Sequence, residues 1–345
     1  KEHHSSGVFF YTYHMSILLT GITTSGTPHI GNYIGAIKPS IEQSKNFKNN
    51  FLFLADYHSL IKNQDPELTY KSSLEIAAAW IACGIDTKKV NFYRQSSIPQ
   101  ILELSWILNA VTPKGLLNRA HAYKAAVDLN ENTDPDKGIN AGLFNYPILM
   151  SADILLFDAD FVPVGSDQKQ HIEMTRDIAG RFNNTYGNTF TLPEPIISEN
   201  TPLLSGLDGR KMSKSYNNFI KLFSSENELR KLINQIVTDS LLPGEEKDTK
   251  SSILFEYFKA FTKDSKLKDI KRLFKEGMGW GDLKKMLFEI INQELSPLRQ
   301  KYDELMNSPE SVEEILIEGE KKAIIQAEIK IKEVREKVGI KPLHG

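Results

Sequence analysis

The sequence predicts an α/β protein in which a doubly wound parallel sheet is followed by an all-helical region. Three observations support this fold class. Short apolar runs of strand length alternate with longer stretches of helical spacing up to about Phe182. A Gly/Thr/Ser loop joins the first strand to the first helix, as in nucleotide-binding α/β folds. Beyond about Ser224 the strand-like alternation disappears and charged amphipathic helices follow.

The elements of the sheet region follow an N-terminal stretch, "KEHHSSG", that resembles the end of a His-tag. We expect residues 1–14 to be a leader outside the fold and Met15 to be the native start. The first helix is expected to be kinked at Pro39, which has no N–H for the helix ladder. Asp65 is a plausible cap for the next helix. The expected strands are 16–22, 51–55, 90–94 and 161–165, and the expected helices are 65–85, 99–111, 144–157 and 167–182.

The later helices are separated by "LPGEEKD", "EGMGWGD" and "NSPES", and the sequence contains no internal repeat. We therefore expect a doubly wound domain over residues 15–220 and a helical domain over residues 221–345. The last helix could pack back on the first domain.

Composition and charge narrow the function classes. The 345 residues suit one large or two ordinary domains, and 40% apolar residues are ample for a core. With 42 basic and 44 acidic residues the net charge is −2, so a nucleic-acid partner must meet a local patch. Cys83 is the single cysteine, which argues against disulfides and cysteine metal clusters and predicts a cytoplasmic location. No run approaches the ~18 apolar residues of a membrane span, so no membrane partner is expected.

The stretch "GTPHIGNY" (26–33) is the first candidate site. Its glycine spacing fits no dinucleotide-binding loop, and Asn32 and Tyr33 stand where a P-loop has Lys and Ser/Thr. His29 and Asn32 lie one turn apart at a helix start, where the helix dipole and the side chains suit an anion. A tight turn and an ordinary helix start are the alternative.

The stretch "GRKMSKSYNN" (209–218) is the second candidate site. Lys211 and Lys214 would give a mobile loop two compact cations for a polyphosphate, and Ser213 and Ser215 would add hydroxyls. A solvated charged loop is the alternative. The order of the two motifs favours a site, because one follows the first strand and the other follows the last.

The two motifs resemble the "HIGH" and "KMSKS" signatures of the aminoacyl-tRNA synthetases with a Rossmann catalytic domain. Asn32 replaces the second His of the first signature, whereas "KMSKS" matches in full. Within that class the chain is similar to the bacterial-type tryptophanyl-tRNA synthetases, because "GNYIGAI", "LMSADILLFDADFVPVGSDQKQHIEMTRDIAGRFN" and "GRKMSKS" run in that family's order. The resemblance extends from about Leu18 to the C-terminus. It implies a Rossmann-like catalytic domain over 15–220 and a tRNA anticodon-binding domain over 221–345.

The resemblance implies that ATP lies across the two signature loops and brings Mg²⁺ with it. Two departures limit the transfer of residues. Thr23 and Thr24 replace the Gln-Pro of many relatives, and residues 120–138 differ where Lys124 or Lys137 would approach the phosphates. The implied catalytic residues are His29, Asn32, Lys211 and Lys214. The implied ATP-binding residues are Thr23, Thr24, Ser25, Gly31, Asn32, Gly165, Ser166, Asp167, Leu203, Lys211, Met212, Ser213, Lys214 and Ser215.

The helix through "MSADILLF" carries an Asp on an otherwise apolar face. A buried carboxylate needs a partner, and the indole N–H of tryptophan is a donor that matches an ionised Asp. From the residues alone, a helix cap or a pair with a buried Arg is the alternative. The resemblance implies that Asp153 recognises the indole, and that Leu19 replaces the Phe of many relatives. The implied tryptophan-binding residues are Leu19, Gly21, His58, Met150, Asp153, Ile154, Val162, Val164 and Gln168.

The implied reaction is ATP-dependent activation of L-tryptophan to an adenylate with release of pyrophosphate, followed by transfer to the 3′ end of tRNA(Trp). Such a ligase needs no side-chain nucleophile. The tRNA should meet the helical region, where residues 251–277 alternate Lys/Arg with aromatics, although a solvated helix face also explains that pattern. Relatives are homodimers, which implies a homodimer here.

Three alternatives remain open at this point: a tyrosyl-tRNA synthetase, a small nucleotidyltransferase, and a non-enzymatic synthetase-like regulator. A protein-bound transition metal is not expected, because His58 and His171 have no further ligands at metal-site spacing.

Overall fold

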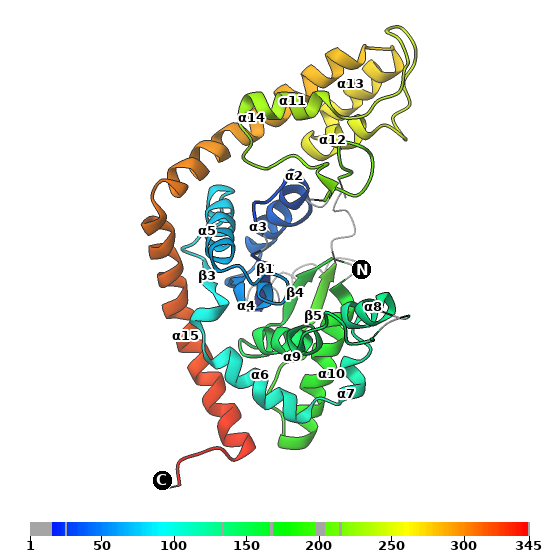
Figure 1. Cartoon of the computed structure of the whole chain (residues 1–345). Coiled ribbons are helices and arrows are strands. Elements are labelled where there is room, and N and C mark those ends of the chain that lie inside the picture. Colours follow the sequence, from blue (N-terminus) through cyan, green and yellow to red (C-terminus); the bar gives the residue numbers. More distant parts are fainter. Residues whose placement is uncertain are drawn as a thin grey trace, which may run out of the picture.

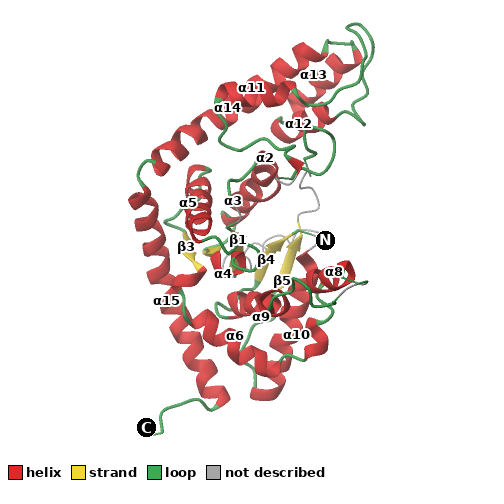
Figure 2. Ribbon diagram, viewed as in Figure 1, coloured by secondary structure: helices red, strands yellow, loops and turns green. Residues whose placement is uncertain are grey.

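The computed structural model describes residues 16–24, 26–130, 132, 134–165, 168–197, 204–213 and 216–343. Its centre is a five-stranded parallel sheet in the order β3-β2-β1-β4-β5 (Figure 1; Figure 2). The order runs outward from β1 in both directions, which confirms the predicted doubly wound fold. In such sheets ligands bind beyond the carboxyl ends of the strands where the order reverses, here between β1 and β4. The strands are β1 (Ile17–Thr23), β2 (Asn49–Ala55), β3 (Val90–Arg94), β4 (Phe161–Val164) and β5 (Glu194–Ile197).

Helices cover both faces of the sheet, and β2 shows why its sequence is apolar throughout. Phe51 and Phe53 join an apolar cluster with α6, α9 and α10, whereas Leu52 and Leu54 join another with α3 and α5. Because successive side chains of a strand point to opposite faces, both faces are buried. The helices of this part are α2 (Ile30–Asn32), α3 (Lys38–Ser44), α4 (Asp56–Ser59), α5 (Pro66–Ala82), α6 (Gln100–Val111), α7 (Lys114–Leu117), α8 (His121–Leu129), α9 (Ala141–Leu155) and α10 (Lys169–Tyr186).

The structure corrects two details of the first elements. The kink expected at Pro39 is replaced by a π-helical turn over Tyr33–Ile37, which ends where the Lys38 N–H bonds to the Tyr33 carbonyl. Pro39 then falls in the first turn of α3, where a helix requires no N–H bond from it. Strand β5 was not among the expected strands. The predicted cap at Asp65 is confirmed, because its side chain accepts the N–H groups of Glu67 and Leu68.

The helical region consists of α11 (Glu226–Asn234), α12 (Ile253–Phe261), α13 (Asp264–Lys275), α14 (Trp280–Met306) and α15 (Pro309–Val338). Helices α14 and α15 form a long arm (Figure 1). The arm begins beside the group formed by α11, α12 and α13 and then runs along the side of the sheet. Helix α14 packs on α5, α11 and α12, and α15 packs on β3 and α6. One apolar cluster runs from α3 and α5 into α12 and α14, so the two regions share a core. The division at residue 220 stays a prediction. Within the described ranges no helix combines the length and the apolar character that crossing a membrane requires.

Helix α15 lies against β3, the edge strand on that side of the sheet. The approach is so close that a Cβ atom on Gly319 would lie 1.9 Å from the carbonyl oxygen of Phe92. Arg94, at the end of β3, pairs with Glu313 and Glu320 of the helix, each at 2.7 Å. Covering an edge strand in this way protects its unpaired backbone groups from other chains.

We expect Gly319→Ala to destabilise the protein, although alanine favours a helix over glycine by ~1 kcal/mol. The methyl group meets backbone rather than a flexible side chain, so the helix must move from β3 at a cost of about 1–3 kcal/mol. Urea unfolding measures this. Gly281→Ala in α14 is the matched control, because a Cβ there has nothing within 4 Å. It should be neutral or stabilising, and equal stability of the two variants would contradict the close contact.

Candidate functional site

The first signature segment forms a reciprocal cap at the start of α2. The His29 Nδ1 atom accepts the Asn32 N–H at 3.2 Å, and the Asn32 side-chain oxygen accepts the His29 N–H at 3.0 Å. The two side chains therefore fix each other's backbone at the start of α2. Just before this segment, buried Thr24 bonds through its N–H and hydroxyl to the Ser59 hydroxyl, at 3.0 and 2.8 Å. Thr23 ends β1 and is exposed.

The second signature segment is held by one buried asparagine. The Asn218 side-chain oxygen accepts the Ser213 N–H at 2.9 Å, and its amide nitrogen donates to Asp208 at 2.7 Å and to the Lys211 carbonyl at 3.2 Å. The hydrogen bond from Asn218 lowers the pKa of Asp208 to about 2, with help from Arg210. The Lys211 side chain is exposed, and no ion-pair partner for it lies among the described residues.

The structure brings the two signature segments together. The Ile30 N–H donates to the Ile220 carbonyl at 2.9 Å, and the Leu222 N–H donates to the Pro28 carbonyl at 3.0 Å. Buried Met212 packs against the first loop, since a Cβ on Gly31 would lie 3.0 Å from its sulfur atom. The chain directly after the second signature segment therefore lies against the first signature segment.

Asp153 on α9 is fully buried, and its carboxylate is bound by two side chains from neighbouring strand ends. The His58 Nε2 atom lies 2.9 Å from Oδ2, and the Gln95 amide nitrogen lies 2.8 Å from Oδ1 and 2.9 Å from Oδ2. Burial raises the pKa of Asp153, and the hydrogen bonds from His58 and Gln95 oppose that rise. The structure thus shows neither a helix cap nor an arginine pair, which were the two alternatives from the residues alone.

The apolar residues predicted for tryptophan belong to one cluster, which fills the face of the sheet covered by α6, α9 and α10. Leu19, Ile154 and Val162 are buried, and Met150 and Val164 pack against the cluster half-buried. Gly21 on β1 is exposed, and a Cβ there would lie 2.6 Å from the Phe53 ring. Small and apolar groups together with a buried acceptor are the groups that an aromatic ring with one donor requires.

Gln168 takes part in a chain of hydrogen bonds that crosses from α10 to α9. Its side-chain oxygen accepts from the His171 Nδ1 atom at 2.7 Å, so Nε2 accepts from the Tyr146 hydroxyl at 2.5 Å. Burial raises the pKa of that hydroxyl. Sequence reasoning missed Tyr146 and Gln95, because neither follows a spacing that marks a site.

Several predicted site residues lie outside the part of the chain that the structure describes. Gly165 follows β4 and is exposed. The residues outside the described ranges are Ser25, Ser166, Asp167, Leu203, Lys214 and Ser215, together with the leader and Met15.

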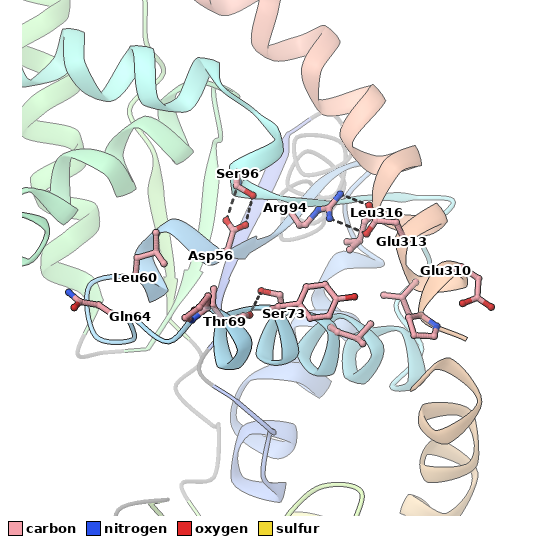
Figure 3. A pocket seen from close by; sticks show the side chains of 15 residues that line it. Asp56, Leu60, Gln64, Thr69, Ser73, Arg94, Ser96, Glu310, Glu313 and Leu316 are labelled. Atoms are coloured by element: carbon pink, nitrogen blue, oxygen red, sulfur yellow. Dashed lines mark hydrogen bonds and ion pairs between the residues drawn. The ribbon is translucent and has the colours of Figure 1, made fainter. Parts of the chain in front are cut away.

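A separate pocket of about 800 Å³ lies between α5, the ends of β2 and β3, and the start of α15 (Figure 3). Arg94 reaches across it to Glu313, and Asp56 turns toward Ser96. This pocket lies on the outer side of the segment that carries Gln95. Within the described ranges no three His, Cys, Asp or Glu side chains gather as a metal site requires.

A doubly wound parallel sheet that carries the two signature segments is the arrangement of a class I aminoacyl-tRNA synthetase. The family model described as tRNA synthetases class I (W and Y) matches residues 13–296, and the chain belongs to this family. A curated tryptophan–tRNA ligase from Neisseria meningitidis is 51% identical over 94% of this chain and 98% of its own length. One from Xanthomonas axonopodis is 54% identical over 94% of this chain and 77% of its own.

A solved structure supports the same grouping. The tryptophanyl-tRNA synthetase of Campylobacter jejuni, complexed with ADP and tryptophan, is 43% identical and superposes with a TM-score of 0.85 over 94% of this chain and 99% of its own. The predicted family, a bacterial-type tryptophanyl-tRNA synthetase, is therefore confirmed.

We expect Asn218→Ala to loosen the second signature segment. Without the Asn218 amide, the carboxyl pKa of Asp208 should rise from about 2 toward its ordinary value, which NMR titration measures. Cleavage by trypsin after Arg210 and Lys211 should become faster, because the Lys211 carbonyl and the Ser213 N–H lose their partner. An unchanged titration and an unchanged cleavage rate would show that Asn218 does not hold the loop.

Proposed function

We propose that this chain is a tryptophan–tRNA ligase that activates L-tryptophan with ATP and transfers it to tRNA(Trp). The observation that carries the proposal is that the chain directly after the second signature segment binds the first one, through Ile30 with Ile220 and Leu222 with Pro28. Tryptophan–tRNA ligases at 51% and 54% identity support it, as does the relative that holds ADP and tryptophan.

In the first step a carboxylate oxygen of tryptophan bonds to the α-phosphorus of ATP while the bond from that phosphorus to the pyrophosphate oxygen breaks. In the second step a hydroxyl of the terminal ribose of the tRNA attacks the activated carbonyl, and AMP leaves. Neither step needs a side-chain nucleophile, so the protein contributes positioning and charge stabilisation. We assign charge stabilisation to His29, Asn32, Lys211 and Lys214, and Mg²⁺ enters as part of the ATP substrate.

For the other contacts with ATP and tryptophan we assign the residues that were named from the sequence. Thr24, fixed by Ser59, and Met212, packed near Gly31, give the nucleotide site preformed walls. The ribose and adenine contacts at 165–167 and 203 rest on the resemblance. For tryptophan, we assign the indole N–H to Asp153 and the ring to the apolar cluster around it.

Partners beyond tryptophan and ATP are also part of the proposal. We assign tRNA contact to the helical region, and we propose that the enzyme is a homodimer in the cytoplasm. Trp106, 79% exposed, and Leu102, 44% exposed, lie on α6 and are suitable for contact with a second copy.

The alternatives are less well supported. A tyrosyl-tRNA synthetase shares the fold, since one from Archaeoglobus fulgidus superposes with a TM-score of 0.63 at 19% identity. The high-identity relatives are tryptophan–tRNA ligases. A nucleotidyltransferase needs no helical region of this length, and a regulator needs no complete "KMSKS" segment. Exchange of pyrophosphate into ATP with each of the twenty amino acids tests these alternatives, and exchange that depends on tryptophan is expected.

We expect Asp153→Asn to weaken activation of tryptophan and to erode its margin over phenylalanine. A site built around a substrate N–H rejects an analogue without it by ~10⁴–10⁵, because its own polar group is left unpaired. Pyrophosphate exchange with both amino acids gives kcat/KM for each. Unchanged kinetics and undiminished discrimination would show that Asp153 is not the indole partner.

We expect Lys211→Ala and Lys214→Ala each to slow adenylate formation on the order of 10²-fold, roughly 2.7 kcal/mol, because a donor to the departing pyrophosphate is lost. Tryptophan affinity should change little, since the interaction forms mainly in the transition state. Pre-steady-state measurement of adenylate formation decides this, with tryptophan affinity measured separately. Wild-type adenylate formation with a defect only in transfer to tRNA would make 209–218 a tRNA-contact loop.

A further inference from the structure

Gln95 has an amide whose two ends are both fixed. It begins a 3₁₀ turn (Gln95–Ser97) directly after β3 and has no exposed surface. The side-chain oxygen accepts the Tyr57 N–H at 3.1 Å, and the nitrogen donates to both oxygens of Asp153. Because a backbone N–H can only donate, it holds the amide oxygen on its own side and leaves the amide nitrogen facing the carboxylate.

The backbone on either side of Gln95 is fixed as well. Arg94 is bound to Glu313 and Glu320 on α15, and Ser96 donates through its N–H to Asp56 at 3.0 Å and through its hydroxyl to the same carboxylate (Figure 3). A residue with fixed neighbours and a fixed amide is preorganised, so it needs no rearrangement to hold its partner.

The surroundings of Asp153 make such a donor necessary. From α4, His58 donates to the carboxylate and the charge of Asp56 opposes its ionisation. From β3, the buried Tyr93 hydroxyl, which has no hydrogen-bond partner in the described structure, carries a pKa raised by burial and by the charge of Asp153. On the other helices packed against α9, His171 of α10 pairs with Tyr146, and Glu103 of α6 pairs with Arg335.

We propose that Gln95 is a positioning residue of the tryptophan site, which keeps the Asp153 carboxylate ionised and oriented toward the indole N–H. The inference rests on the proposed function. Oδ2 accepts from both His58 and Gln95, whereas Oδ1 accepts only from Gln95 among the described residues, so Oδ1 keeps acceptor capacity for the indole.

The first test is Gln95→Met, which keeps the volume and removes the donor. We expect the KM for tryptophan in pyrophosphate exchange to rise on the order of tenfold, with little change in the KM for ATP. The acidic limb of kcat/KM for tryptophan should move to higher pH, because a carboxylate that loses hydrogen bonds is protonated more easily. A tryptophan analogue with sulfur in place of the indole N–H should be activated as well by the variant as by the wild type.

Gln100→Met is the matched control, because Gln100 is also buried but bonds to Glu328 of α15 rather than to the site. It should leave the pH profile and the selectivity unchanged. Equal weakening of tryptophan and of the sulfur analogue by Gln95→Met, without a pH shift, would reduce Gln95 to a structural role and overturn the proposal.

A second variant, Gln95→Glu, keeps the shape and gives a pH dependence of the opposite sign. Two adjacent carboxyl groups share one proton, so tryptophan activation should be retained at low pH and lost as the pH rises and both ionise. Activation that does not fall with rising pH would contradict the proposal. The Asp153→Asn experiment distinguishes a failure of the proposed role of Asp153 from a failure of the proposed role of Gln95. Full discrimination between tryptophan and phenylalanine by the Asp153→Asn variant refutes the proposed role of Asp153. Lost discrimination by Asp153→Asn, together with wild-type behaviour of Gln95→Met, refutes the role of Gln95 alone.

Discussion

The buried carboxylate of Asp153 is the constraint on which the site depends. An ionised carboxylate without solvent is costly unless donors replace the lost water, and burial raises its pKa accordingly. Both donors come from segments that follow strands, His58 after β2 and Gln95 after β3. A parallel sheet brings such segments to one edge, so the fold supplies from two distant parts of the sequence what the α9 helix cannot supply for itself.

The docking of α15 is part of the same arrangement. Gly319 lets the helix reach the backbone of β3, and Arg94 ties the end of that strand to Glu313 and Glu320. The next residue along the chain is Gln95. The C-terminal helix therefore helps to define where the donor to Asp153 stands, although Glu313 lies 219 residues beyond Arg94 in the sequence.

A structural feature could be predicted from the sequence where the residues that produce it lie close together in the chain. The strands of the sheet's centre could be predicted because burial on both faces leaves continuous apolar runs. The cap at Asp65 could be predicted because a cap acts on residues two and three positions further along the chain. Strand β5 was missed because it begins with Glu194 and Pro195 and has only two β-branched residues, Ile196 and Ile197, whereas β4 has three apolar strand formers in its four residues. Gln95 was missed because its partner, Asp153, lies 58 residues away, and no local pattern marks a glutamine at a strand end.

In the second signature loop the backbone is held by hydrogen bonds, while the Lys211 side chain is exposed. Asn218 binds the backbone at Lys211 and Ser213, while on α12 the Glu256 carboxylate accepts the Ser205 hydroxyl at 2.9 Å and the Tyr257 hydroxyl donates to the Ser205 carbonyl at 2.7 Å. None of these bonds involves the Lys211 side chain, whose charge has no counter-ion among the described residues. A polyphosphate is the kind of ligand that such a cation favours. Because Glu256 and Tyr257 bind Ser205, α12 holds the segment from which the second signature loop begins.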